Sequence, residues 1–569
     1  MMDVDASLTL LGGFGLVQSL NFLVYLLCSG SSGWLLTGVS FTIGEPDGYR
    51  CSLPPINGTG VGDTVFAEEC ELIHEDEEAG KNVTTGCLYG WDYDSIHGET
   101  SSVTDLELVC DRAILAGTLT SIHFGGALAG SYVLGQLSDL FGRRLIVFGS
   151  VIAVVVTGTG LSFTWSFGLM CFLRFLNGCC IPGLLTVSYV RQIEMFTPNR
   201  RVRAQLCSEM AWVIGICLLS PMAYLLPNWR DFQLTISLLC IPLIPLVWFS
   251  FESIRWLVLK GRVEEAEEIL QRIAKSKNIS HTGYFLLDQQ DPDLQNGNQP
   301  SKVDAIELET KPALENEGSN PEKPPLEDQD SVPAVDDSKR QSPGSKTNKA
   351  TILDLFKTRA LIMQTLFVFF CWFASSVVYY GFFINAGNLV GNKYLNFFLI
   401  SLTEAPCYII NYFVMTRLGR RRPLIFYYLV SGVACVVTGV IPAETADGTD
   451  LTVVILVIAL IGKLFASAAF DVLYLATAEI FPTILRSAAV GAASVVSRAG
   501  GMVAPFIVYL NVIHNSIPMI VFGVVSLVAG LLVLPLPETN NRALPETLDD
   551  GAKLTSKEPT EDDASPAEV

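Results

Sequence analysis

The sequence predicts an all-α membrane protein with twelve transmembrane helices, arranged as two six-helix repeats. Three observations lead to this prediction: the apolar composition, the number of long apolar runs, and a pair of duplicated motifs. Half of the 569 residues are hydrophobic, 17% are charged, and the mean hydropathy is +0.42. This composition is too apolar for an ordinary soluble protein. The net charge of −20 argues against a nucleic-acid partner, which requires a basic face.

Twelve runs are long enough to cross a bilayer, which takes about 20 mostly apolar residues. A large soluble protein with buried helices is the alternative, but its helices would carry charged outer faces, and runs such as 145–165 have no charged residue. The twelve runs lie near 14–41, 113–136, 145–165, 167–190, 204–226, 232–251, 360–385, 393–414, 422–442, 451–476, 486–510 and 515–536.

The orientation follows from the positive-inside rule, because arginines gather in alternate short loops. These loops are predicted to be cytosolic, which places both termini in the cytosol of a multi-pass plasma-membrane protein. No basic segment or cleavage site precedes the first run, so we expect it to be a retained helix. The arginines in question are Arg143, Arg144, Arg200, Arg201, Arg203, Arg420, Arg421, Arg422 and Arg486.

The segment 43–112 is predicted to be a large extracellular loop. It is acidic, and it contains two glycosylation sequons, at Asn57 and Asn82. Four cysteines in such a segment predict two disulfides, with three possible pairings. These cysteines are Cys51, Cys70, Cys87 and Cys110.

Four regions follow from these boundaries. Residues 1–251 form a six-helix half that contains the loop 43–112, and residues 360–536 form the second half. Between them, residues 252–359 comprise an amphipathic cytosolic helix from Arg255 to Lys275 and a Pro-, Asp-, Glu- and Ser-rich linker that cannot bury enough surface to fold. Residues 537–569 form an acidic cytosolic tail.

Two motifs occur twice and in the same order. The segment from Gly135 to Arg144 returns as Val414 to Arg421, and the segment from Glu194 to Arg201 returns as Glu479 to Arg486. The repetition indicates that a six-helix unit was duplicated. Parallel halves of this kind place a substrate cavity at their interface near the bilayer midplane, where rocking of the halves alternates access.

These motifs resemble those of a known transporter group. The segment from Gly135 to Arg144 resembles the loop signature of the major facilitator superfamily. The segments beginning at Leu108, Glu252, Glu479 and Pro537 resemble those of its organic ion (solute carrier 22) family. The segments Trp372 to Gly381 and Gly462 to Phe470 look most like the carnitine and zwitterion carriers and their member-15-like relatives. The resemblance implies the major facilitator fold and transport of a small organic ion.

Charged residues in the duplicated motifs predict a cytosolic gate. We expect Asp139 to accept hydrogen bonds from Arg143 or a helix N-terminus. The other expected pairs latch the outward-facing state and break when the halves rotate. Solvated surface pairs worth about 0–1 kcal/mol are the alternative, but matched positions in both halves favour gating. The predicted gate residues are Asp139, Arg143, Arg144, Glu194 with Arg201, Glu252 with Arg255, Glu479 with Arg486, and Glu538 with Arg542.

Charges within the apolar runs predict the substrate site, because a charge at mid-bilayer costs at least about 2.5–3.5 kcal/mol and needs a wet cavity or a partner. Lys463, Ser467, Asp471 and Tyr474 share one helical face. Lys463 and Asp471 either form a mutual ion pair or bind substrate or a coupling ion. Arg498 and Glu404 complete the set. Glu209 is a further carboxylate, either a cation contact or a group near the cytosolic boundary.

Arg498 bears most on specificity. In the resembled family, anion and carnitine carriers have arginine here, whereas cation carriers have aspartate. A guanidinium favours a carboxylate, while Asp471 and Glu404 suit an amine. Aromatic side chains could form cation–π walls for that amine, with ordinary helix packing as the alternative for each. They are Trp212, Tyr379, Tyr380, Phe470 and Tyr474.

The predicted function is therefore secondary active transport of small organic cations or zwitterions of the carnitine or betaine type. The alternatives are an organic anion exchanger and a non-transporting receptor or adhesion protein. The sequence contains no Walker-type phosphate loop, no metal-ligand spacing and no nucleophile with its base, so no enzymatic step, metal or cofactor is expected. The expected partners are the substrate, a coupling ion (Na⁺ or H⁺) and membrane lipids.

Overall fold

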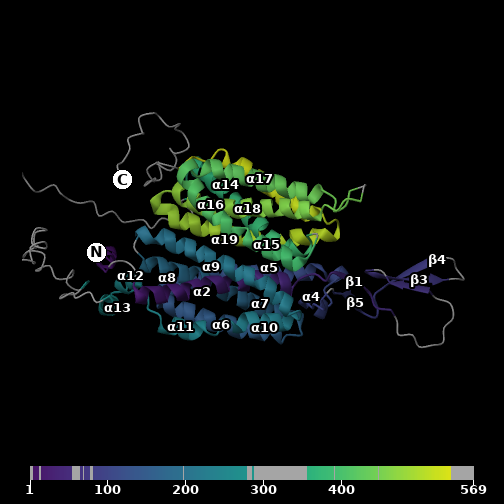
Figure 1. Cartoon of the computed structure of the whole chain (residues 1–569), viewed down its shortest axis with the longest axis horizontal. Helices are drawn as coiled ribbons and strands as arrows, with labels where there is room; N and C mark the ends of the chain where they lie inside the picture. The colour runs from purple at the N-terminus through teal and green to yellow at the C-terminus, as the bar shows by residue number, and fades with distance from the viewer. Residues whose placement is uncertain are drawn as a thin grey trace, which may run out of the picture.

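The computed structural model describes eleven stretches of the chain: residues 4–11, 15–53, 64–67, 69–76, 81–95, 97–196, 198–277, 285–286, 355–389, 391–445 and 448–539. Two helical bundles lie side by side, the first built from the N-terminal part of the chain and the second from the C-terminal part (Figure 1). The predicted sequon at Asn57 lies outside the described residues, as do Arg542 and the linker between residues 287 and 354.

The first bundle begins with α2 (Leu16–Thr37), which α3 (Val39–Thr42) extends. Helix α5 (Ile114–Phe141) and helix α6 (Arg143–Ser162) meet at Gly142, whose φ of +105° permits the sharp reversal. Helix α7 (Phe167–Pro182) passes through a π-helical turn (Gly183–Val187) into α8 (Ser188–Met195). Then come α9 (Pro198–Leu225), α10 (Trp229–Leu238) and α11 (Leu243–Phe249).

The second bundle repeats this pattern. It contains α14 (Arg359–Ile384), α15 (Lys393–Leu402), α16 (Glu404–Leu418), α17 (Arg421–Val440), α18 (Thr452–Ile480), α19 (Thr483–Val508) and α20 (Ile517–Val533). Gly419, with φ of +82°, makes the reversal that Gly142 makes in the first bundle. Within the described residues, eleven helical stretches are long and apolar enough to span a membrane, and α20 is a shorter apolar helix at the twelfth predicted run.

Small residues bring helices of the first bundle into close contact. Gly126 and Gly130 of α5 face the backbone of α7 near Phe175 and Cys179, and an added Cβ would overlap that backbone. Gly178 of α7 packs in the same way on the backbone of His123. Close backbone approach at small residues is the usual way in which transmembrane helices associate. His123 itself is fully buried.

The loop 43–112 forms two small antiparallel sheets beyond one end of the bundles (Figure 1). Strands β1 (Gly48–Cys51) and β5 (Trp91–Asp94) form one sheet. Strands β2 (Thr64–Ala67), β3 (Glu71–Asp76) and β4 (Lys81–Gly86) form the other, with Asn82 in β4. Of the three pairings left open by the sequence, the structure contains Cys51–Cys87 and Cys70–Cys110. A short helix, α4 (Ser102–Asp105), leads back to α5. We call this end of the molecule the loop face.

The opposite end, which we call the linker face, carries a small helical cluster. Helices α1 (Val4–Leu10), α12 (Ile254–Leu259) and α13 (Val263–Ser276) share a buried apolar core. The carboxylate of Glu267 accepts hydrogen bonds from the backbone N–H groups of Phe285 (2.9 Å) and Leu286 (2.8 Å). The prediction of one continuous helix from Arg255 to Lys275 is wrong. The chain turns at Gly261, with φ of +76°, and forms the two helices α12 and α13 instead.

Candidate functional site

A buried ion pair lies in the second bundle. The Nζ atom of Lys463, on α18, is 2.8 Å from Oε1 of Glu404 at the start of α16, and both side chains are fully buried. The ammonium also donates to the Ser467 hydroxyl at 2.9 Å. It lies 3.6 Å from the ring centroid of Tyr379 and 4.4 Å from that of Phe383. The mutual Lys463–Asp471 pair that the sequence left open is therefore not formed.

Two further charges lie in the same bundle without an ionic partner among the described residues. The carboxylate of Asp471, two turns along α18, accepts a hydrogen bond from the amide of Asn411 at 2.8 Å. The guanidinium of Arg498, on α19, donates to the hydroxyl of Tyr380 at 3.2 Å. Neither forms a salt bridge in the described part of the chain, although charges at this depth are costly.

Aromatic rings surround these charges and link the two bundles. The indole N–H of Trp212, on α9, donates to the hydroxyl of Tyr379, on α14, at 3.2 Å. The ring of Phe470 lies 5.6 Å from Tyr379 and 5.7 Å from Tyr474. Tyr474 remains 45% exposed, whereas Trp372, which packs on its ring, is fully buried. The predicted aromatic residues are thus brought together at the bundle interface.

Glu209 joins the site from the first bundle. Its carboxylate accepts a hydrogen bond from Gln205 on its own helix, and Tyr408 on α16 of the second bundle lies close to it. Asp471 and Glu404 are both close enough to act on it electrostatically. Of the two interpretations of Glu209, the structure therefore favours a place in the site.

Three other neighbours were missed by sequence reasoning. Asn411 contacts Asp471, Phe383 contacts Lys463, and Trp372 packs on Tyr474 with ring centroids 4.3 Å apart. One signal could have found Asn411, because it lies two turns after Glu404 and so shares its helix face. Phe383 could likewise have been found one turn after Tyr379. Trp372 begins one of the segments that resemble the carnitine and zwitterion carriers, but nothing in the sequence assigned it to the site.

Charged residues at the linker face of the first bundle form one cluster. The guanidinium of Arg143 lies 2.9 Å from Asp139, as predicted, and 3.2 Å from Glu194. Glu252 accepts the backbone N–H groups of Arg143 (3.1 Å) and Arg144 (3.0 Å), which caps the N-terminus of α6. Arg144 donates to the Trp248 carbonyl, and Arg255 to the Glu194 carbonyl at 3.2 Å. The side chain of Arg201 lies outside the described residues.

The second bundle has an equivalent cluster. Arg420 lies 2.9 Å from Glu479, and Glu538 accepts the backbone N–H groups of Arg420 (2.9 Å) and Arg421 (3.1 Å). The correspondence with Arg143, Glu194 and Glu252 reflects the duplication that the motifs indicate. The sequence predicted that Glu479 pairs with Arg486, and it did not place Arg420 among the gate residues. It paired each acid within its own motif, whereas these contacts join two motifs.

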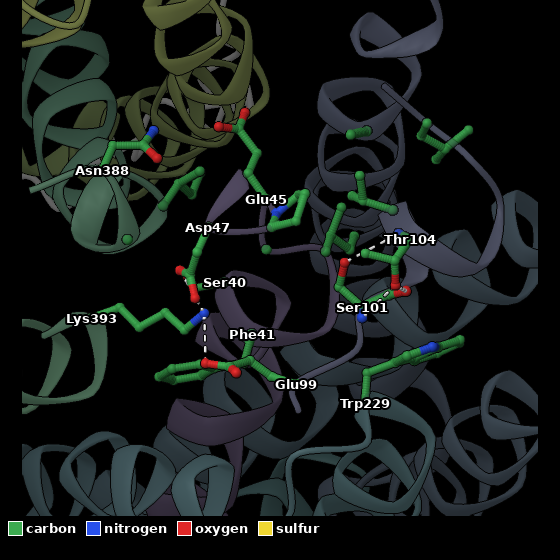
Figure 2. Close-up of a pocket in the computed structure, with 18 of the residues that line it drawn as sticks. Ser40, Phe41, Glu45, Asp47, Glu99, Ser101, Thr104, Trp229, Asn388 and Lys393 are labelled. Carbon is green, nitrogen blue, oxygen red and sulfur yellow. Dashed lines mark hydrogen bonds and ion pairs between the residues drawn. The ribbon is translucent and has the colours of Figure 1, made fainter. Parts of the chain in front are cut away.

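Contacts at the loop face join the two bundles. The Nζ atom of Lys393, at the start of α15, lies 3.1 Å from Oδ1 of Asp47 and 2.9 Å from Oε1 of Glu99 (Figure 2). Asn511 donates to Glu45 at 2.9 Å, and Ser220 of α9 donates to the Tyr394 carbonyl at 2.5 Å. The molecule is therefore closed at its loop face, while the clusters described at the linker face each join elements of a single bundle.

Comparisons with known proteins identify the family. The family model of sugar (and other) transporters matches residues 66–291 and 302–548. The organic cation transporter protein of Drosophila melanogaster is 31% identical, over 98% of this chain and 96% of that protein. The chain belongs to the organic cation transporter family of the major facilitator superfamily. Solute carrier family 22 member 3 of Mus musculus is 29% identical over 98% of this chain and 97% of that protein.

A solved structure agrees with this family at the level of the fold. The inward open conformation of the xylose transporter XylE from E. coli superposes with a TM-score of 0.57, covering 92% of this chain and 97% of that one at 15% identity. The predicted fold class and family resemblance are confirmed: this organic cation transporter relative is a multi-pass membrane carrier with the twelve-helix major facilitator fold, and its family is not enzymatic.

Proposed function

We propose that the protein carries small organic cations or zwitterions, of the carnitine or betaine type, across the plasma membrane by alternating access. One observation carries the proposal: Arg498 and Asp471 lie in the site without an ionic partner among the described residues, while Lys463 and Glu404 neutralise each other. Removing a charge from water is costly unless an opposite charge or hydrogen bonds compensate it, and each of these two charges has only a neutral partner among the described residues. A substrate with both signs of charge would satisfy Arg498 and Asp471 together.

Each end of a zwitterion would meet matching chemistry. The Arg498 guanidinium presents a planar donor fork to a carboxylate, and the Tyr380 hydroxyl holds it in place. The positive end would meet Asp471, Glu209 and the faces of Tyr379, Phe470 and Tyr474. Tyr379 already lies under the Lys463 ammonium at 3.6 Å, so its ring is suited to a cation. The same carboxylates are the residues that would bind a coupling ion, Na⁺ or H⁺.

The loop face would be extracellular and the linker face cytosolic. The two disulfides of the loop fit an oxidising compartment, and the arginine clusters at the linker face fit the positive-inside rule. Closure at the loop face would then make this an inward-facing state. The clusters around Arg143 and Arg420 would approach each other when the carrier turns outward and would hold that state.

Glycosylation tests this orientation. With an extracellular loop, the wild-type protein from cultured cells should migrate faster after treatment with a peptide N-glycosidase. The variant Asn57→Gln/Asn82→Gln should migrate at the deglycosylated position without treatment. Each single variant should show an intermediate position. The extracellular position of the loop would be contradicted by two results together. The migration of the wild-type protein would not change on treatment, and antibody labelling of intact cells would not detect the loop.

Uptake into cells tests the function itself. Labelled carnitine and tetraethylammonium should each show saturable uptake above that of untransfected cells, and each should inhibit the other because they share the amine subsite. A labelled aromatic anion should enter at the background rate. Saturable uptake of the anion alone would contradict the proposal, and absence of saturable uptake for all three at normal surface expression would favour the receptor interpretation.

Organic anion exchange is the second candidate. Arg498 favours it, since its guanidinium has no anionic partner among the described residues. The pairing of Lys463 with Glu404 weighs against it, because the site then offers one uncompensated cation beside two carboxylates, Asp471 and Glu209. An anion without a positive end would leave these two carboxyl groups without a partner of opposite charge.

A further inference from the structure

A cavity lies at the loop face, apart from the site between the bundles. Its volume is about 610 Å³, within the range of about 300–1,000 Å³ that is typical of small-molecule pockets. The loop 43–112 covers it on one side, and the ends of helices from both bundles form the rest (Figure 2). Among the described residues, its lining contains one basic side chain, that of Lys393. Its acidic residues are Glu45, Asp47, Glu69, Asp94 and Glu99.

The Lys393 side chain shows how this cavity holds a cation. Its ammonium lies between the carboxylates of Asp47 and Glu99, at 3.1 and 2.9 Å, and 5.8 Å from the ring centroid of Tyr394. The Tyr394 hydroxyl donates to the same Glu99 oxygen at 3.3 Å. Two carboxylates and an aromatic ring form the kind of cage that recognises alkylammonium groups. Its present occupant is tethered to a flexible four-carbon stem and is 21% exposed, so it can leave.

The neighbours of the Glu99 carboxylate favour its charged form. Burial raises the pKa of Glu99, but the Lys393 ammonium and backbone N–H groups outweigh burial and hold that pKa below its ordinary value. Nearby, Glu45 accepts the neutral amide of Asn511 at 2.9 Å. Acidic side chains outnumber basic ones in the described lining of the cavity, and such a lining raises the local concentration of small cations.

We propose that this cavity is a second binding site, for small quaternary or protonated amines, in which the ligand takes the place of the Lys393 ammonium between Asp47 and Glu99. Lys393 belongs to the second bundle, whereas Asp47 and Glu99 belong to the loop of the first. Displacement of the Lys393 ammonium breaks the ion pairs with Asp47 and Glu99 that hold the bundles together at the loop face. An extracellular cation would thus favour opening toward itself. The proposal rests on the proposed function only for the extracellular position of this face.

Protection of an introduced cysteine measures occupancy directly. Asn388 is exposed and lines the cavity, and the four loop cysteines are held in disulfides. The full-length Asn388→Cys variant is labelled in intact cells with a membrane-impermeant maleimide, and wild type gives the background. Tetraethylammonium is the probe. It should slow labelling in a saturable manner, and its half-protecting concentration is the quantity compared between variants.

Three variants in the Asn388→Cys background are expected to change the half-protecting concentration in different directions. Lys393→Gln removes the tethered competitor and should lower the half-protecting concentration by at least about threefold. Asp47→Asn/Glu99→Gln removes the cage charges and should raise it by at least about tenfold. Asp231→Asn, which changes an exposed acid of α10 outside the cavity, should leave it unchanged. Surface biotinylation corrects each value for delivery to the membrane.

A variant of the site between the bundles separates the two sites. Asp471→Asn should impair tetraethylammonium uptake but leave protection of Asn388→Cys as in wild type. The inference is overturned if tetraethylammonium does not slow labelling, if Lys393→Gln weakens protection, or if Asp471→Asn abolishes it. Tetraethylammonium uptake is recorded in parallel with maleimide labelling. If tetraethylammonium is taken up but does not protect Asn388→Cys, the second binding site is overturned and the proposed function stands. If it protects Asn388→Cys but is not taken up, the proposed function is overturned and the second binding site stands.

Discussion

Replacing Arg498 by alanine is expected to lower carnitine uptake by about 10- to 100-fold, because a hydrogen bond to a charged group contributes about 1.5–3 kcal/mol. Uptake of tetraethylammonium should fall by less than about threefold, since this ion has no carboxylate for the guanidinium to bind. Initial uptake rates for both labelled compounds, measured over a range of concentrations in the same cells, give the comparison. The quantity expected to change is the ratio of the carnitine uptake rate to the tetraethylammonium uptake rate.

Two further variants make this result interpretable. Arg498→Lys keeps the charge but loses the planar donor fork, so it should retain part of the carnitine uptake. Arg417→Ala removes an exposed arginine at the end of α16 and should leave both activities at the wild-type level. Equal loss of carnitine and tetraethylammonium uptake in Arg498→Ala, at normal surface expression, would show that Arg498 supports the structure rather than the substrate carboxylate.

The second large effect concerns the buried pair of Lys463 and Glu404. Removing one partner leaves a buried charge uncompensated, so Lys463→Met and Glu404→Gln should each destabilise the protein by about 3–5 kcal/mol. The double variant Lys463→Met/Glu404→Gln should recover most of this loss, because it buries no net charge. Thermal unfolding of the purified proteins in detergent, together with surface expression, measures the effect.

Asp471→Asn is the matched control for this cycle, because it neutralises a carboxylate on the same helix that hydrogen-bonds to an amide and not to a cation. It should unfold close to the wild-type temperature. If either single variant of the pair is as stable as Asp471→Asn, or if the double variant is as unstable as the single variants, then Lys463 and Glu404 do not form a stabilising buried ion pair.

The sequence carried enough information to predict the fold because the signals for it are local. A run such as 145–165 has the length and composition of a membrane span, whatever surrounds it. The duplicated motifs likewise indicate two halves without knowledge of their packing. The spacing of Lys463, Ser467 and Asp471 places them on one helix face, and the structure shows that face turned toward Glu404 and Asn411.

Contacts between residues on different helices could not be predicted from such local signals. The ion pair joins Lys463 to Glu404, on another helix, and the alternative within one helix, with Asp471, was equally consistent with the spacing. The pairing of Arg420 with Glu479 also crosses between helices. Four cysteines in one loop admit three pairings, and only the course of the short strands selects Cys51–Cys87 and Cys70–Cys110.

The structure of the purified protein with bound carnitine, determined by electron cryomicroscopy, would show directly whether Arg498 and Asp471 hold the two ends of the substrate. We expect density for carnitine between the bundles, with its carboxylate within hydrogen-bond distance of Arg498 and its trimethylammonium group against Asp471 and the rings of Tyr379 and Tyr474. Carnitine bound in the reverse direction, or with its carboxylate on Lys463 after that side chain has left Glu404, would contradict it.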